Sequence, residues 1–208
     1  AVIVLPHVAK LKSLRAAFFD KTAETNLKPM QEILAATSML EYLAFVEHQA
    51  PLELLRRAPK TVRKLNLLIA SPEIIKNLPA MFPQLEELVI ERFNNGDNDE
   101  YQDLFAQLCS QLPTLKQFEL LSFSDPVAII NAVKDLQKIQ IQINVEQATK
   151  LLLAKHKHSL IHLNIFFEIE IKDIKLLEEF ANLEVLNIYG THNDTSSIIS
   201  VNHTLPNL

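Results

Sequence analysis

The sequence predicts an α/β solenoid in which stacked strand–helix units form a parallel sheet on the concave side and helices on the convex side. Three observations support this. The phrase Leu-x-x-Leu-x-Ile, or a close variant, returns at 85–90, 136–141, 160–165 and 183–188. Apolar residues inside the phrase alternate with other residues, which is the period of a strand. The segments between the phrases carry helical spacing, and a fixed repeat of this kind indicates a solenoid.

The copies follow one another along almost the whole chain at intervals of 21 to 30 residues. Position 1 of each copy falls at Leu11, Leu40, Val62, Leu85, Leu115, Leu136, Leu160, Leu183 and Leu208. Position 4 holds Leu14, Leu43, Leu65, Leu88, Phe118, Ile139, Leu163 and Leu186, and position 6 holds Ala16, Phe45, Leu67, Ile90, Leu120, Ile141, Ile165 and Ile188. We expect both columns to be buried, each large side chain stabilising the fold by roughly 1.5–3 kcal/mol.

Helices are expected between the strands. Ser71-Pro72 and Asp125-Pro126 each place a capping side chain before a proline that suits the first helical turn. Tyr101, Leu104, Phe105, Leu108, Cys109 and Leu112 form one apolar stripe. Further helices are predicted near 27–37, 51–58, 145–156, 171–181 and 194–202, with ends expected at Pro79, Pro83, Pro113 and Pro206. A strand, a crossover helix and the next strand make a right-handed parallel unit.

The repeated phrase resembles the leucine-rich repeat, and the resemblance covers residues 11–208 in about eight to nine copies. Position 9, where this family usually has Asn or Cys, conforms only at Asn144. Uneven copy lengths with helices resemble the ribonuclease-inhibitor-like and F-box-associated branch. The resemblance implies a horseshoe-shaped solenoid that holds its ligand on the concave sheet.

Composition narrows the class of protein. Apolar residues make up 48% and charged residues 22%, and no apolar run is long enough to span a bilayer. The two glycines, Gly96 and Gly190, stand apart, which excludes a glycine-rich phosphate loop. A single cysteine suits a reducing compartment, so we expect a cytoplasmic or nuclear location. Residues 1–208 are predicted to form one domain, and both ends without polar caps suggest an excerpt of a longer chain.

The predicted binding residues lie on the concave face at positions 3, 5 and 7 of the copies. Leu68, Leu121, Phe166 and Tyr189 at position 7 would form an apolar strip, a feature that marks interfaces. The alternative is a strip covered by a neighbouring segment or made of scattered side chains. The full set is Tyr42, Val46, Leu68, Val89, Glu91, Glu119, Leu121, Gln140, Gln142, Asn164, Phe166, Asn187 and Tyr189.

Charge is spread unevenly along the chain. Residues 1–64 hold ten Lys and Arg against six Asp and Glu, whereas the remaining residues hold ten against nineteen. Five of the basic residues crowd into 56–64, where they could contact phosphates. No aromatic residues interleave to stack bases, so we favour a solvated helix end and loop. This basic patch consists of Arg56, Arg57, Lys60, Arg63 and Lys64.

No metal, cofactor or catalytic site is expected. His156, His158 and His162 lack a fourth ligand nearby, and the acidic run 91–103 has its glycine before the acids, contrary to a calcium loop. Cys109 lies on an apolar stripe and is expected to be an inert buried thiol.

The sequence therefore predicts a non-catalytic scaffold that binds a protein partner on its concave sheet, with no small-molecule substrate. A narrower version is the substrate-recognition part of a ubiquitin-ligase adaptor of the F-box type. The alternatives are a bacterial effector domain acting in the host cytosol and an RNA-binding or RNA-export module that uses residues 56–64.

Overall fold

The computed structural model describes residues 8–16, 24–46, 51–93, 98–120, 127–141, 145–166, 177 and 179–189. The chain divides into two compact units, Ala1–Gly96 and Asp97–Leu208, named unit 1 and unit 2. The predicted single domain stays a prediction. In the described part of the chain, no helix has both the length and the apolar character needed to cross a bilayer.

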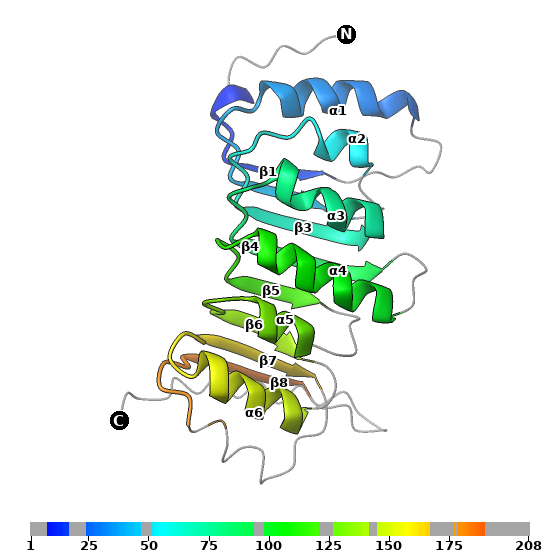
Figure 1. Cartoon of the computed structure of the whole chain (residues 1–208). Coiled ribbons are helices and arrows are strands. Elements are labelled where there is room, and N and C mark those ends of the chain that lie inside the picture. The colour runs from blue at the N-terminus through cyan, green and yellow to red at the C-terminus, as the bar shows by residue number, and fades with distance from the viewer. Residues whose placement is uncertain are drawn as a thin grey trace, which may run out of the picture. The chain divides into compact units, whose positions relative to one another are not determined.

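Unit 1 alternates strands and helices (Figure 1). Its strands are parallel, and each pairs with the next along the chain. Its elements are η1 (Val8–Lys10), β1 (Ser13–Ala16), α1 (Glu24–Ala36), β2 (Tyr42–Phe45), α2 (Leu52–Leu55), β3 (Lys64–Ala70), α3 (Pro72–Met81) and β4 (Glu87–Phe93).

Unit 2 repeats the arrangement, again with parallel strands paired in chain order. Its elements are α4 (Asn98–Gln111), β5 (Gln117–Leu120), α5 (Val127–Ala132), β6 (Lys138–Ile141), α6 (Val145–His156), β7 (His162–Phe166) and β8 (Val185–Tyr189). The helices predicted near 171–181 and 194–202, and the capping pair Asp125-Pro126, lie almost entirely outside the described residues.

The strand register confirms the predicted alignment of the copies. In unit 1, the position 4 column pairs as Leu14, Leu43, Leu65 and Leu88 on successive strands. In unit 2, the same column pairs as Phe118, Ile139, Leu163 and Leu186. Position 6 is also in register within each unit, from Ala16 to Ile90 and from Ile141 to Ile188.

Burial follows the same columns. From Leu40 to Leu183, the position 1 residues are buried, as are Leu43, Leu65 and Leu88 at position 4. Leu11 departs from the pattern: it is 36% exposed. It begins the first copy, so no preceding copy among the described residues packs against it. Alternation of buried and open positions leaves the apolar core between the sheet and the helices in each unit.

The helices pack as their sequences predict. All six residues of the apolar stripe, five on α4 and Leu112 directly after it, are buried. The ring of Phe105 meets that of Phe118 on β5 edge-on with centroids 5.3 Å apart. Ser71 caps α3 by accepting a hydrogen bond from the backbone N–H of Ile74 at 3.3 Å. The expected helix end at Pro79 is wrong, because α3 continues to Met81. A proline so near the end removes only one hydrogen bond of the last turn.

A backbone ladder joins successive copies where the chain enters each strand. The carbonyl of the residue at position 2 accepts hydrogen bonds from the N–H groups at positions 2 and 3 of the next copy. Lys12 accepts from Glu41 and Tyr42 at 2.9 Å, and Ile161 accepts from Glu184 and Val185 at 2.8 and 3.1 Å. At position 9, β3 and β4 remain paired through Ala70 and Phe93. In β3 and β4, backbone pairing at both ends of the strand thus takes the place of the usual Asn.

Candidate binding surface on the uncovered sheet faces

In each unit the helices lie on one face of the strands (Figure 1). The side chains that the structure describes at positions 4 and 6 from β2 onward are buried, so they point into that layer. Positions 3, 5 and 7 therefore point to the opposite face. No described element covers this face in either unit. Parallel sheets are usually covered on both faces, so an uncovered one is available for a partner.

The open face of unit 1, named the unit 1 surface, combines apolar and polar side chains. Tyr42, Val46, Leu68, Val89 and Glu91 lie there and are half-buried. Asn66 pairs in register with Val89, and its buried Oδ1 atom accepts no hydrogen bond from the described residues. The unit 1 surface is thus a patch of modest apolar area around one amide.

Ion pairs fix the charged side chains at the strand entrances of unit 1. Lys64 on β3 contacts Glu87 on β4 at 2.9 Å. The hydrogen bond that Lys64 donates to Glu87, together with the negative charge of Glu87, raises the pKa of Lys64 above its ordinary value. One residue earlier in the same two copies, Arg63 contacts Glu86 at 2.8 Å. Arg63 and Lys64 are therefore each ion-paired with a carboxylate of the following copy.

These pairs change the character of the predicted basic patch. Arg56 also has a carboxylate partner, Glu53, at 2.9 Å within the same turn of chain. Three of its five residues are thus paired. Arg57 and Lys60 are exposed and form no ion pair with any described residue.

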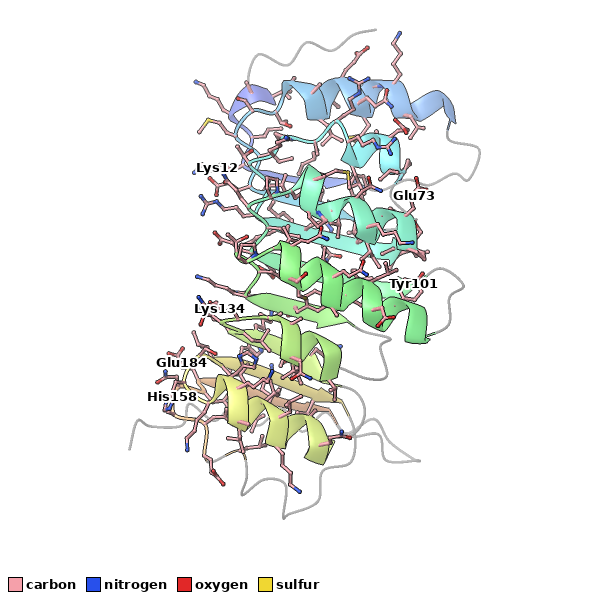
Figure 2. The ribbon with its side chains drawn as sticks, in the orientation of Figure 1. Lys12, Glu73, Tyr101, Lys134, His158 and Glu184 are labelled. Atoms are coloured by element: carbon pink, nitrogen blue, oxygen red, sulfur yellow. The ribbon has the colours of Figure 1, made fainter. Side chains whose placement is uncertain are left out.

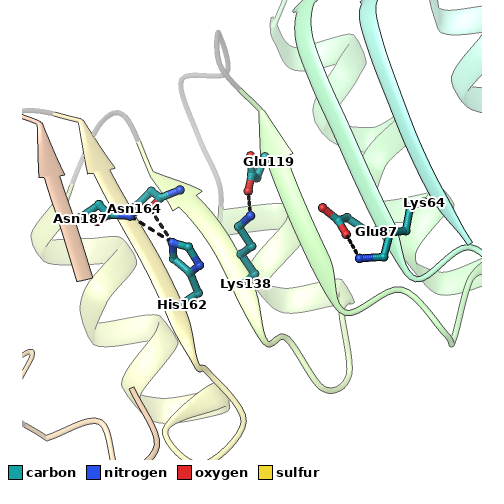
Figure 3. Close-up of polar contacts among 7 residues, drawn as sticks. All are labelled: Lys64, Glu87, Glu119, Lys138, His162, Asn164 and Asn187. Atoms are coloured by element: carbon teal, nitrogen blue, oxygen red, sulfur yellow. Dashed lines mark hydrogen bonds and ion pairs between the residues drawn. The ribbon is translucent and has the colours of Figure 1, made fainter. Parts of the chain in front are cut away.

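The open face of unit 2, named the unit 2 surface, is polar (Figure 3). Glu119 on β5 forms an ion pair with Lys138 on β6. The next strands place Gln140, Asn164 and Asn187 in one row, in register. Gln140 and Asn164 were expected to be open to solvent, but they are only 6% and 8% exposed. Neighbouring side chains on strands about 4.8 Å apart cover them.

His162, Asn164 and Asn187 form a hydrogen-bonded group, named the amide cluster (Figure 3). Asn187 Nδ2 donates to Asn164 Oδ1 at 2.9 Å, and His162 Nε2 lies 2.9 Å from the same oxygen. Burial lowers the pKa of His162 below its ordinary value, and the positive charge of Lys138 lowers it further, against smaller opposing effects of Asn164 and Glu119. The imidazole is therefore neutral at physiological pH.

Several predicted surface residues lie wholly or partly beyond what the structure describes. Leu121 and Gln142 are outside the described residues. Phe166 and Tyr189 pair in register at the ends of β7 and β8, but the structure describes their backbone and not their side chains. The apolar strip therefore stays a prediction.

The remaining candidates have structural explanations. Burial raises the pKa of the Cys109 thiol to about 12, so it is an inert core residue at neutral pH. His156 is buried, with Nε2 at 2.9 Å from the carbonyl oxygen of Ile130, whereas His158 lies exposed in the turn after α6 (Figure 2). Searched across the described ranges, the structure holds no group of three or more His, Cys, Asp or Glu arranged to bind a metal.

Sequence reasoning did not select the position 3 residues that the structure shows to be paired: Glu87, Lys138 and His162. The signal was present, because opposite charges occupy the same position of adjacent copies at Lys64 and Glu87. In a parallel sheet such residues are direct neighbours, so the register alone could have identified the pair.

Strands in register, buried position 4 and 6 columns and helices on one face define a leucine-rich-repeat fold. No family model matches the sequence, and no curated protein matches it either. Among solved structures, the chain is similar to TLR13, a leucine-rich-repeat protein, in the crystal structure of the TLR13–ssRNA13 complex. The TM-score is 0.53 at 18% sequence identity, over 89% of this chain and 27% of that chain. At this identity the likeness shows the fold alone.

Proposed function

We propose that the chain is a non-catalytic scaffold that binds a protein partner on the uncovered faces of its sheets. The observation that carries this proposal is a parallel sheet face that, in each unit, no described element covers. Half-buried apolar side chains on the unit 1 surface and hydrogen-bonded amides on the unit 2 surface supply the two kinds of contact that protein interfaces combine.

Side chains that are already held in place favour binding. Ion pairs between β3 and β4 and between β5 and β6 restrain long side chains before any partner arrives. Immobilising such a side chain on binding costs roughly 0.5–1.5 kcal/mol. A preformed surface avoids part of this cost, which is how a rigid solenoid would bind without rearranging.

The charges of the chain favour a protein partner over RNA. The net charge is −5, and three of the five basic residues in 56–64 have carboxylate partners. Phosphate binding needs basic side chains that are free to replace counterions. The ssRNA in the neighbouring crystal structure belongs to TLR13 and is not evidence for this chain.

Finer features of the proposal rest on the resemblance of the repeated phrase. They are the right-handed horseshoe of about eight to nine copies, the ribonuclease-inhibitor-like branch and a role as substrate-recognition part of a ubiquitin-ligase adaptor in the cytoplasm or nucleus. A bacterial effector domain in a host cytosol is the alternative. Identifying the captured partner distinguishes these versions.

The test is capture of partners from cell lysate by wild type and by a Val46→Asp/Leu68→Asp variant of the unit 1 surface. Ala80→Asp is the matched control, because Ala80 is exposed on α3, on the helix side. We expect the double variant to lose specific proteins that wild type and control retain, with all three folded by circular dichroism. Capture that is unchanged in the variant would overturn the unit 1 surface as a binding site, and capture that disappears with nuclease would overturn a protein partner.

A further inference from the structure

The amide cluster offers a second, more specific kind of recognition. Its three side chains come from two adjacent strands, β7 and β8, and lie on the open face of unit 2 (Figure 3). Asn164 is buried at the centre, whereas His162 and Asn187 are half-buried and so partly accessible. The cluster therefore has a fixed inner part and an accessible outer part.

The distances favour a proton on Nε2 of His162. Nε2 lies 2.9 Å from Asn164 Oδ1 and 3.2 Å from Asn187 Nδ2. A bare Nε2 would place two acceptors 2.9 Å apart, which is repulsive. With the proton on Nε2, both His162 and Asn187 donate to Asn164 Oδ1, and all three side chains are satisfied at this contact.

This assignment leaves a defined set of groups for a ligand. His162 Nδ1 is then an acceptor, and Asn187 keeps one N–H donor and its Oδ1 acceptor. Among the described residues, none makes a hydrogen bond to these remaining groups. The outer part of the cluster therefore presents one acceptor on His162 and a donor and an acceptor on Asn187.

Charge selects the class of ligand. His162 is neutral, and the charged groups facing it on neighbouring strands, Lys138 on β6 and Glu119 on β5, neutralise each other in an ion pair. Among the described residues that face His162, an anion would find no unpaired cation and a cation would find no unpaired carboxylate. An uncharged group with both a donor and an acceptor matches the site.

Deepening the proposed function, on which this step rests, we infer that the amide cluster binds an uncharged amide of the protein partner, either a peptide group or an Asn or Gln side chain. The N–H of such a group can donate to His162 Nδ1, and its carbonyl can instead accept from Asn187 Nδ2, without displacing the hydrogen bonds inside the cluster. The unit 2 surface would thus recognise polar, uncharged parts of the partner, while the unit 1 surface contacts apolar ones.

The experiment uses the whole chain and one defined probe, N-acetyl-asparagine N-methylamide, followed by NMR of the side-chain amide groups and the His162 ring nitrogens. We expect saturable shifts of the Asn164, Asn187 and His162 signals. Acetate, phosphate and methylammonium at the same concentration should give none. Asn187→Leu should weaken probe binding by at least about tenfold, the effect of one lost hydrogen bond of roughly 1.4 kcal/mol. Asn66→Leu, at the equivalent position on β3, should not.

Acidification separates recognition from a purely structural role. Protonation of Nδ1 turns the acceptor into a donor, so probe binding should weaken as the pH falls through the pKa of His162, while acetate begins to shift the same signals. Should Asn187→Leu fail to fold, Asn187→Asp tests the same step by adding a charge without changing the shape. It should reduce binding of the neutral probe.

Two outcomes overturn the inference: no saturable shift with the neutral probe, or equal shifts with the ions. Failure of this inference can be distinguished from failure of the proposed function. Absent probe binding together with partner capture that still depends on Leu68 would remove this inference alone. If the probe binds but partner capture does not depend on Leu68, the proposed site on unit 1 is wrong, whereas the amide cluster remains a binding site.

Discussion

At the scale of single residues, the open faces are ordered by side chains that reach across to the next strand. The Lys64–Glu87 pair is partly exposed, and such pairs add little to stability, with a median of about 0–1 kcal/mol. Their effect is on geometry, because each partner limits the rotamers of the other. The amide cluster differs because Asn164 is buried, so its oxygen would lose free energy if its donors were removed.

The lowered pKa of His162 makes folding stability depend on pH. Its ordinary value is 6.5 and its folded value is lower, so the unfolded chain takes up the proton first. The contribution of His162 is therefore present above about pH 6.5 and is lost as the pH falls through the folded pKa. We expect wild type to lose more stability than His162→Gln between about pH 7.5 and about pH 5.5 in urea unfolding.

The control for this comparison is His158→Gln, because His158 is exposed in the turn before β7. It should lose about as much stability on acidification as wild type. Equal losses in wild type and His162→Gln would show that His162 does not link folding to pH.

At the scale of elements, the sequence predicted the strands and their register because two independent columns, positions 4 and 6, both had to remain apolar. The helix starts were also predictable where a cap and a proline coincide, as at Ser71 and Pro72. The end of α3 was not, because a proline in the last turn costs too little to stop a helix.

Side-chain partners across strands were harder to predict than the strands themselves. Register shows that Lys64 neighbours Glu87, but whether Arg63 reaches Glu86 depends on rotamers that no pattern reports. The burial of Gln140 likewise depends on how neighbouring side chains lie over it. The candidate site was therefore predicted as a face, and its chemistry became visible only in the structure.

Glu86 and Glu87 pair with Arg63 and Lys64, so removing the two carboxylates should strengthen phosphate binding. We expect Glu86→Gln/Glu87→Gln to bind single-stranded RNA more tightly than wild type at low salt, because Arg63 and Lys64 become free. The slope of log K against log salt should steepen by roughly 1 to 2, the value for two added phosphate contacts. Filter binding across a salt series measures it.

Glu32→Gln/Glu73→Gln is the matched control, since it changes the net charge equally at exposed positions on α1 and α3. RNA affinity that rises as much in this control would mean that net charge, and not the release of Arg63 and Lys64, explains the effect. Figure 2 shows Glu73 at the start of α3, on the side away from the first residues of the strands.

At the scale of the whole molecule, each copy within a unit packs mainly on the copies before and after it in that unit. In unit 2, the backbone ladder and the position 4 column run through β6, β7 and β8 without a long-range closing contact among these strands. In such an array the stability is close to a sum of terms for each copy and each neighbouring pair. Damage to one strand should therefore be felt most by its direct neighbours.

Leu163→Ala tests this in unit 2. Leu163 is fully buried at position 4 of β7, and truncating it should cost about 2–5 kcal/mol. Native-state hydrogen exchange should show protection falling most in β6, β7 and β8 and less in β5, which does not pair with β7. Lys134→Ala, in the exposed turn before β6, serves as the control and should leave exchange unchanged. A uniform loss over all four strands would mean that unit 2 opens as one cooperative block, and the surfaces on its strands could then not respond separately to a partner.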